Sequence, residues 1–180
     1  MVAAAPTVAI FASDKGPGDP ERASLMGEVG RVFARKGARM LCLAEDGVIP
    51  VPLITAARTA GGTVEVVADA SIVLPQALAG VPITVLPDQT ERHAYLAGAS
   101  VAFVALPGSL ASVRSLFGAW SSGTTRPVVM LNRHRAFEVL RGFAADVLAA
   151  GVPNYDRGIQ FAETVEELWN KVVWVSEQKR

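Results

Sequence analysis

The sequence has little cysteine and no excess of charge of either sign. Cys42 is the single cysteine among 180 residues, which excludes an internal disulfide and a metal site built from paired cysteines. Lys and Arg together number 17, as do Asp and Glu, which argues against binding to nucleic acid or to an anionic membrane through bulk charge. A lone cysteine is typical of the reducing cytoplasm, and Met1–Pro6 lacks the basic segment of a secretory signal peptide. We therefore expect a cytoplasmic protein.

Charged residues are also scarce, at 19%, whereas apolar residues make up 51% of the chain. This balance excludes a disordered protein and predicts a large core, and the length fits a single domain, 1–180. The segment Ala94–Val113 carries no charge and is about as long as a membrane span, but Pro107-Gly108 interrupts it. We interpret this segment as a helix end, a buried strand and a turn, and we expect no membrane partner.

Short β-rich runs alternate with helical patterns along the whole chain. Thr7–Ala12 is typical of a strand, and Asp19-Pro20 then supplies a helix N-cap and a first helical residue. Near the other end, Thr164 and Glu167 form a capping box ahead of an apolar stripe. The pattern predicts an α/β fold, a single Rossmann-like domain whose doubly wound, mostly parallel sheet is flanked by helices. The expected strands are 7–12, 39–43, 63–67, 83–86, 101–106, 127–131 and 159–161, and the expected helices are 20–36, 52–60, 88–98, 110–121, 137–150 and 165–173.

Ligands of such a sheet bind beyond the carboxyl ends of the strands, near the point where the strand order reverses. The loops expected at that edge are 13–19, 44–51, 107–112 and 132–135. In the third loop, Pro107-Gly108-Ser109 opens a helix whose free N–H groups and dipole favour an anion such as phosphate. Simple capping of that helix by Ser109 is the structural alternative.

Five segments of the chain carry a resemblance to known proteins: Thr7–Ser13 (TVAIFAS), Ala57–Val67 (ARTAGGTVEVV), Glu91-Arg92, Val101–Gly108 (VAFVALPG) and Arg126–Asn132 (RPVVMLN). They resemble the lonely-guy (LOG) family and the related molybdenum-cofactor carrier proteins, and the resemblance covers nearly the whole chain. The resemblance implies a Rossmann-like fold and a homodimer or higher homo-oligomer. It also implies one of two functions, because the family's enzymes are phosphoribohydrolases that release the base from a nucleoside monophosphate, whereas the carriers bind their ligand without converting it.

The catalytic signature of this family is only partly present. The family has an E-R-K segment and a PGGxGTxEE segment, and Glu91-Arg92-His93 matches two residues of the first. From Pro107 the chain is PGSLASVRS, so Arg114 and Ser115 stand where the family has two glutamates. Cleavage of a glycosidic bond needs a carboxylate that stabilises an oxocarbenium-like state or activates water, and a cationic Arg114 would do the opposite.

The loop after the second strand departs from the family as well. Leu43-Ala44-Glu45 and Val48-Ile49-Pro50-Val51 stand where the family has glycine-rich GGG and GLMG segments. Glycine lets the backbone approach a phosphate or ribose closely, so side chains at these positions narrow or reshape the pocket. We therefore expect that the hydrolase reaction is absent.

The leading hypothesis is a non-catalytic protein that binds a nucleotide-like, pterin-like or other phosphorylated or anionic small molecule. The residues by themselves identify no cofactor, and the resemblance points to a nucleotide or a molybdopterin-type ligand. Arg92 is the one residue of the family's catalytic type, and no metal site is expected. The candidate ligand contacts are Ser13, Arg92, Pro107, Gly108, Ser109, Leu110, Ala111, Ser112 and Arg114, with Glu45, Glu91, Asn132 and Arg133 as secondary candidates.

Two alternatives remain open from the sequence. In a phosphoribohydrolase with substituted residues, Arg92 would hold the phosphate and Glu45 or Glu91 would supply the acid. In a scaffold or oligomerisation module, Leu43, Val48 and Pro50 would close the pocket. The plainer interpretations are that Arg114 and the turn Arg133-His134-Arg135 are exposed, that Glu45, Asp46 and Glu91 are solvated loop acids, and that Cys42 packs as a small hydrophobe.

Overall fold

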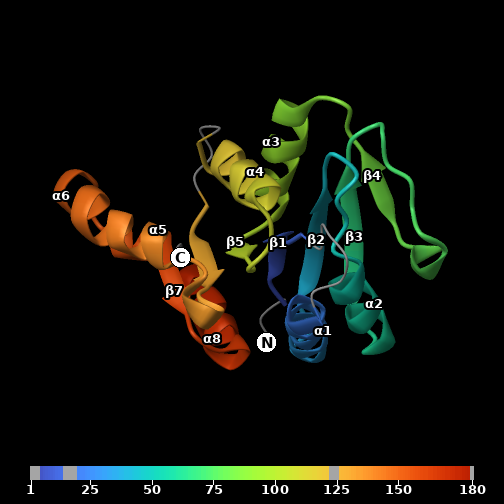
Figure 1. Ribbon diagram of the computed structural model, residues 1–180, viewed down its shortest axis with the longest axis horizontal. Coiled ribbons are helices and arrows are strands. Elements are labelled where there is room, and N and C mark those ends of the chain that lie inside the picture. Colours follow the sequence, from blue (N-terminus) through green and yellow to red (C-terminus); the bar gives the residue numbers. More distant parts are fainter. Residues whose placement is uncertain (1–4, 14–19, 122–125, 179–180) are drawn as a thin grey trace.

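A computed structural model describes residues 5–13, 20–121 and 126–178, and its centre is a parallel β-sheet. The strand order is β4-β3-β2-β1-β5-β6-β7, and every pair of neighbouring strands is parallel. This arrangement confirms the expected doubly wound Rossmann-like α/β fold (Figure 1). The strands are β1 (Thr7–Phe11), β2 (Arg39–Ala44), β3 (Thr63–Ala68), β4 (Ile83–Val85), β5 (Ala102–Ala105), β6 (Val128–Leu131) and β7 (Ile159–Ala162).

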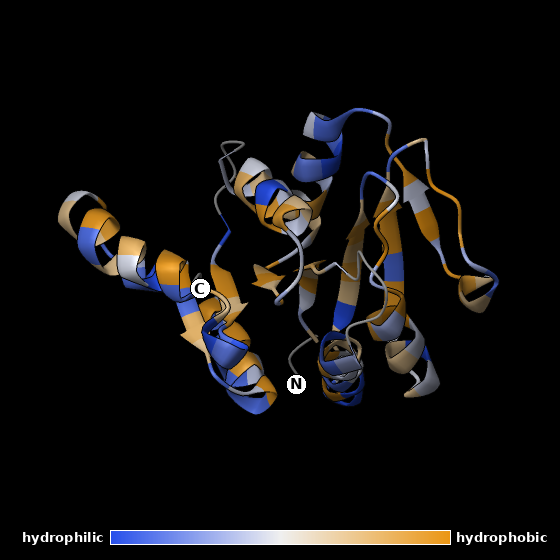
Figure 2. Cartoon of the chain, in the orientation of Figure 1, coloured by the Kyte–Doolittle hydropathy of each residue, from blue (hydrophilic) through white to orange (hydrophobic). Residues whose placement is uncertain are grey.

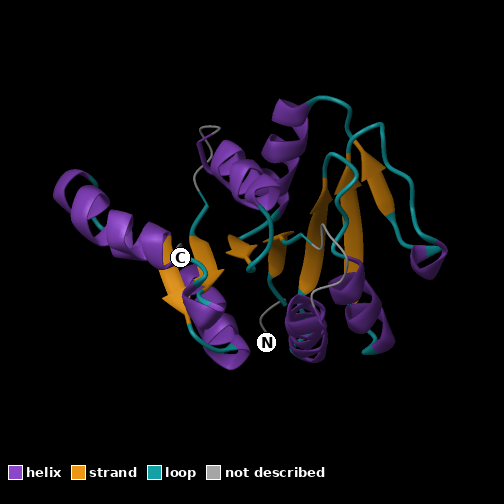
Figure 3. Cartoon of the chain, viewed as in Figure 1, coloured by secondary structure: helices purple, strands orange, loops and turns teal. Residues whose placement is uncertain are grey.

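Helices cover both faces of this sheet (Figures 1 and 3). The helices α1, α2 and α8 pack on one face, whereas α3, α4 and α5 pack on the other. The helices are α1 (Pro20–Arg35), α2 (Val51–Thr59), α3 (Gln89–Ala99), α4 (Leu110–Ser121), α5 (Glu138–Phe143), α6 (Ala149–Gly151), α7 (Tyr155–Gly158) and α8 (Val165–Glu177), with 3-10 turns at Gln76–Leu78 and Arg133–Arg135 and a π-helical segment at Ala144–Leu148.

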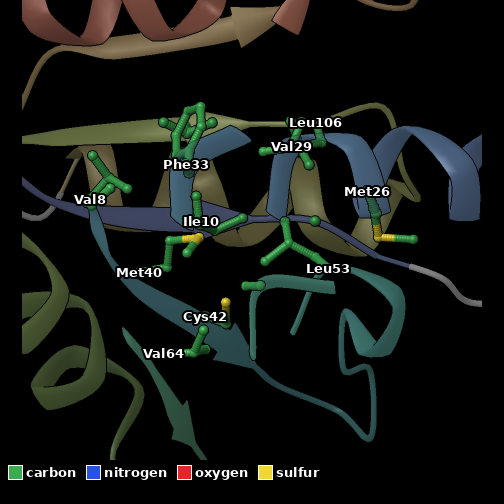
Figure 4. Close-up of a cluster of buried hydrophobic side chains, with 14 of the residues drawn as sticks. Val8, Ile10, Met26, Val29, Phe33, Met40, Cys42, Leu53, Val64 and Leu106 are labelled. Atoms are coloured by element: carbon green, nitrogen blue, oxygen red, sulfur yellow. The ribbon is translucent and has the colours of Figure 1, made fainter. Parts of the chain in front are cut away.

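The two cores follow from the alternation of side chains along the strands. Val8 and Ile10 of β1 point toward α1, and Figure 4 shows Phe33 of that helix above them. Phe33 also meets Trp169 of α8 edge-on, with ring centroids 5.2 Å apart. The apolar stripe expected in the last helix is confirmed, and Figure 2 shows the strands as predominantly hydrophobic. The central strands are buried on both faces, as is typical of parallel sheets, whereas the edge strand β4 is partly exposed.

The strand order reverses between β1 and β5, and this reversal positions the site. From β1 the chain winds outward through β2, β3 and β4, whereas β5, β6 and β7 lie on the other side. Phe11 and Ala105 are paired at the carboxyl ends of β1 and β5. The loops after these strands are therefore neighbours at the edge of the sheet where doubly wound folds bind ligands.

Most predicted elements are confirmed within one or two residues, but the region after β6 differs. The expected helix 137–150 is divided into α5, the π-helical segment and α6, and α7 was not predicted. The π-helical segment is five residues long, which is too short for its own period to show in the sequence. The arm formed by residues 138–151 extends away from the sheet in Figure 1 and exposes the side chains of Val139, Phe143 and Val147.

The uncharged segment Ala94–Val113 comprises the end of α3, the buried strand β5, a turn and the start of α4, as interpreted from the sequence. Across the part of the chain that is described, no helix is long and apolar enough to cross a membrane. The expected N-cap Asp19 and most of the loop 13–19 lie outside the described residues.

Candidate functional site

The loops after β1 and β5 are packed tightly against each other. Ser13 is fully buried, and its hydroxyl accepts a hydrogen bond from the Ser109 hydroxyl at 2.8 Å. The Ser112 hydroxyl donates to the carbonyl of Ser109, also at 2.8 Å. A Cβ atom at Gly108 would lie 2.9 Å from Ser112 Oγ and 3.1 Å from the backbone nitrogen of Ser13, so only glycine fits this turn without rearrangement. The three serine hydroxyls thus bond within the protein, and the Ser109 hydroxyl joins the loop after β5 to the loop after β1.

An open cavity of about 480 Å³ lies next to this turn. It is formed by the first turns of α1, by Pro107 after β5 and by the loop after β6. Its size is within the usual range for small-molecule sites. The lining residues are Pro20, Glu21, Arg22, Ser24, Leu25, Glu28, Pro107, Arg133, His134 and Ala136.

The loop after β6 places Arg133 and His134 at the cavity, and part of its backbone is strained. His134 and Arg135 have φ angles of 54° and 60°, a left-handed conformation that non-glycine residues adopt rarely. Asn132 anchors the loop, because it is buried, accepts a hydrogen bond from the Phe137 backbone N–H at 2.7 Å and donates one to Glu138 at 2.8 Å. Asn132 is thus a scaffold for the loop.

The cavity presents charges of both signs. Arg22, Arg133 and His134 lie on its wall together with Glu21 and Glu28. The pair His134 Nε2 and Glu21 Oε2 is 3.9 Å apart, and both side chains are mostly exposed. Arginine can bind a phosphate or carboxylate in a bidentate manner, whereas a carboxylate accepts N–H donors, so the wall suits an anion that also carries N–H groups.

Near the end of β2, the buried carboxylate of Glu45 is surrounded by hydrogen-bond donors. Glu45 Oε1 lies 3.0 Å from Arg92 Nε and 3.1 Å from His93 Nε2, and the Ser115 hydroxyl donates to Glu45 Oε2 at 2.7 Å. The side chains of Glu45 and Arg92 are only 5% and 6% exposed. The Arg92 guanidinium also donates to the carbonyls of Leu86 and Pro87. Its Nε and one of its terminal nitrogens are therefore engaged by the protein itself.

The pKa of Glu45 is lowered to about 2. Burial alone would raise this pKa, but the hydrogen bonds from His93, Ser115 and Arg92 favour the ionised carboxylate and outweigh the loss of solvation. Because an ionised carboxylate only accepts hydrogen bonds, His93 donates from Nε2. The ring of His93 packs against α4, where a Cβ atom at Gly118 would lie 3.0 Å from His93 Cε1.

A tight turn after β2 positions Glu45 next to these donors. Asp46 and Gly47 have φ angles of 54° and 73°, the backbone of a type I′ turn, and Val48 donates its backbone N–H to the Glu45 carbonyl at 3.0 Å. The Asp46 backbone N–H donates to Asp69 at 3.0 Å, which ties the turn to the end of β3. The hollow beside it measures about 20 Å³, roughly the room for one water molecule. This side of the edge is closed, and Leu43 and Val48 are among the residues that border the hollow.

The structure separates the candidate residues into groups. Pro107 and Arg133 line the open cavity, whereas Ala111 and Ser112 border the small hollow. Arg114 is exposed on α4, Leu110 is 86% exposed, and Glu91 and Asp46 are exposed as the plainer interpretation expected. The expectation that Glu45 is a solvated loop acid is wrong, because it lies on the same face of β2 as Leu41 and Leu43 and is enclosed by α3 and α4.

The residues of α1 that line the cavity were not predicted from the sequence. Glu21, Arg22 and Glu28 fall on the first turns of the helix that follows β1, so their position after the central strand was the available signal. Cys42 is fully buried, and burial raises the pKa of its thiol to about 12, which confirms that it packs as a hydrophobe. Within the described ranges, no group of three His, Cys, Asp or Glu side chains could hold a metal ion.

Comparison with known proteins gives a match in structure but none in sequence. No protein-family model and no curated protein sequence matches the chain. The Moco carrier protein of Chlamydomonas reinhardtii superimposes with a TM-score of 0.70 and 20% identity over 97% of this chain and 99% of that one. The chain has the fold of the molybdenum-cofactor carriers.

Two further structures agree. The molybdenum cofactor binding protein of the phototrophic bacterium Rippkaea orientalis has a TM-score of 0.66 and 14% identity over 95% of this chain and 97% of that one. The structural-genomics target TM1055 has a TM-score of 0.66 and 23% identity over 96% of this chain and 99% of that one. The expected resemblance in fold is confirmed over nearly the whole chain. At these identities the likeness establishes fold and leaves the ligand to be argued from the site.

Proposed function

We propose that this protein is a non-catalytic binding protein for an anionic small molecule of nucleotide or pterin type. The observation that carries the proposal is the open cavity of about 480 Å³ at the reversal of strand order, with Arg133 and His134 on its wall. Doubly wound sheets bind ligands at this place, and arginine suits phosphate. The solved structures with this fold include two proteins described as a carrier and a binding protein of the molybdenum cofactor.

The charges of the cavity favour a ligand with both an anionic group and N–H donors. Arg133 and Arg22 would bind a phosphate or other oxyanion, and the carboxylate of Glu28 would accept N–H groups of a purine or pterin ring. A molybdopterin-type molecule combines these two features, as does a nucleoside monophosphate. The apolar side chain of Leu25 and the rings of Pro20 and Pro107 supply surface for the flat part of the ligand.

The geometry favours binding over catalysis. The alternative phosphoribohydrolase would use Glu45 as its acid, but the pKa of that carboxyl is about 2, so it would be a weak base at neutral pH. The hollow beside Glu45 measures about 20 Å³, which is too small for a substrate. Glu91 is exposed on the first turn of α3.

The test is a comparison of ligand-induced thermal shifts in three proteins. The wild-type chain is scanned with nucleoside monophosphates and with phosphorylated pterins, and the same scan is made with Arg133→Ala and Arg114→Ala. We expect a rise in Tm for the wild-type protein that Arg133→Ala reduces and that Arg114→Ala leaves unchanged, because Arg133 lines the cavity and Arg114 does not. Removal of a bidentate phosphate contact weakens binding by roughly tenfold or more.

The same samples distinguish the alternatives. Chromatography of each ligand after incubation measures any released base. Released base would overturn the proposal of a non-catalytic binding protein and would show that the protein is a phosphoribohydrolase. Absence of any shift across the panel would favour the scaffold or oligomerisation module. The expected homodimer remains a prediction, and native mass spectrometry of the purified protein measures it.

A further inference from the structure

The environment of Glu45 is that of a bound oxyanion. Three donors from two helices converge on its carboxylate: Arg92 Nε and His93 Nε2 from α3, and the Ser115 hydroxyl from α4. Both carboxylate oxygens are used, and one donor is a buried cation. Glu45 itself comes from neither helix but from the end of β2, 47 residues before Arg92 and 70 residues before Ser115.

These donors are held in place without Glu45. The carbonyls of Leu86 and Pro87 bind the Arg92 guanidinium, and the Asp88 side chain caps the helix that carries Arg92 and His93. Ser115 lies within the first turns of α4. A donor set that is preorganised by its own elements binds an anion with little cost of ordering.

We propose that Arg92, His93 and Ser115 form an oxyanion-binding site that the chain fills with its own Glu45, so that the site is closed to carboxylate and phosphate ligands. The type I′ turn at Asp46-Gly47 positions the Glu45 carboxylate among these donors. The anchored turn and the hollow of about 20 Å³ leave no room for a second anion. This closure does not depend on whether the open cavity beside Arg133 binds a ligand.

An ordinary structural ion pair makes a different prediction. If Glu45 only balanced the charge of Arg92, its removal would destabilise the protein and any salt would screen the unpaired charge. If the donors form an oxyanion site, removal of the Glu45 carboxylate would leave a cavity with the shape and polarity of a small carboxylate. Formate would then bind there saturably, whereas chloride at equal ionic strength would not.

The test is chemical rescue of Glu45→Ala by sodium formate and by inorganic phosphate, with ionic strength held constant by sodium chloride. We expect a lower Tm than in the wild-type protein, and a saturable rise of roughly 3 to 6 °C when formate is about tenfold above its dissociation constant. The wild-type protein should show no such rise. Glu45→Gln should show none either, because the amide still fills the space.

Two controls separate a specific site from a general salt effect. Thr164→Ala destabilises the remote helix α8 by removing its cap, and formate should not raise its Tm beyond the wild-type response. Adding Arg92→Met to Glu45→Ala should abolish the rescue. If Glu45→Ala does not accumulate as folded protein, its refolding yield from urea with and without formate gives the same test.

Equal responses of Glu45→Ala and Thr164→Ala to formate would overturn the proposal. So would saturable binding of inorganic phosphate to the wild-type protein that Arg92→Met abolishes, because the site would then be open. Neither result bears on the thermal shifts of the Arg133→Ala protein, so failure of this proposal and failure of the proposed function are distinguishable.

Discussion

The replacement Glu45→Gln should remove a pH-dependent part of the stability of this protein. The pKa of Glu45 falls from 4.5 to about 2 on folding, and at about 1.4 kcal/mol per pKa unit this difference stabilises the folded state by about 3 kcal/mol at neutral pH. Because the pKa is lower in the folded state, the stabilisation is complete above about pH 5 and disappears as the pH falls toward 2. At about pH 3 only about 1 kcal/mol should remain.

Urea unfolding followed by tryptophan fluorescence measures this effect. The useful quantity is the difference in unfolding free energy between the wild-type protein and Glu45→Gln at each pH from about 3 to about 7, since the contributions of distant carboxyl groups cancel. Glu177→Gln, at an exposed position near the end of α8, is the matched control and should change stability by less than about 0.5 kcal/mol at every pH. A difference for Glu45→Gln that does not vary with pH, or one below about 1 kcal/mol at pH 7, would refute the inference that three donors hold the carboxylate ionised.

Three further substitutions or treatments test other parts of the structure. Gly118→Ala should destabilise the protein by about 1 to 3 kcal/mol, because its Cβ would lie 3.0 Å from His93 Cε1. The matched control, Gly98→Ala on the exposed side of α3, should be neutral or stabilising. Thermal unfolding measures the stability of the two variants, and equal Tm values would contradict this prediction. Cys42 should not react with a thiol reagent in the native protein, since it is fully buried and burial raises its pKa to about 12, and rapid labelling without urea would contradict this. Thr164→Ala should cost about 1 kcal/mol of unfolding free energy, because it removes the 3.1 Å cap to the Glu167 N–H; an unchanged urea midpoint would show that the cap contributes nothing.

Much of the fold could be predicted from local patterns. The apolar runs at β1 and β5 and the capping box at Thr164 gave element boundaries that agree closely with the structure. Such signals lie within a few residues of one another, and the period of the apolar positions separates strand from helix. The arm after β6 was predicted less well, because the π-helical segment and α7 have no distinctive local pattern.

The candidate site shows where local patterns stop being sufficient. The sequence by itself determined that the edge of a parallel sheet carries the turn at Pro107–Ser109, and that Arg114 and Ser115 replace acids of the resembled family. It placed Glu45 in the loop after the second strand and predicted a solvated acid there, because a carboxylate at a strand end is exposed unless donors enclose it.

Only the tertiary structure determined which of the charged side chains are buried and paired and which line a cavity. The donors that bury Glu45 come from positions 47 to 70 residues later, and no spacing in the sequence shows that α3 and α4 meet over the end of β2. The open cavity likewise combines α1, Pro107 and the left-handed loop at His134. Packing of distant elements sets which charges are neutralised within the protein and which face a cavity, because the energy of a charge depends on its solvation and its neighbours and not on its place in the chain.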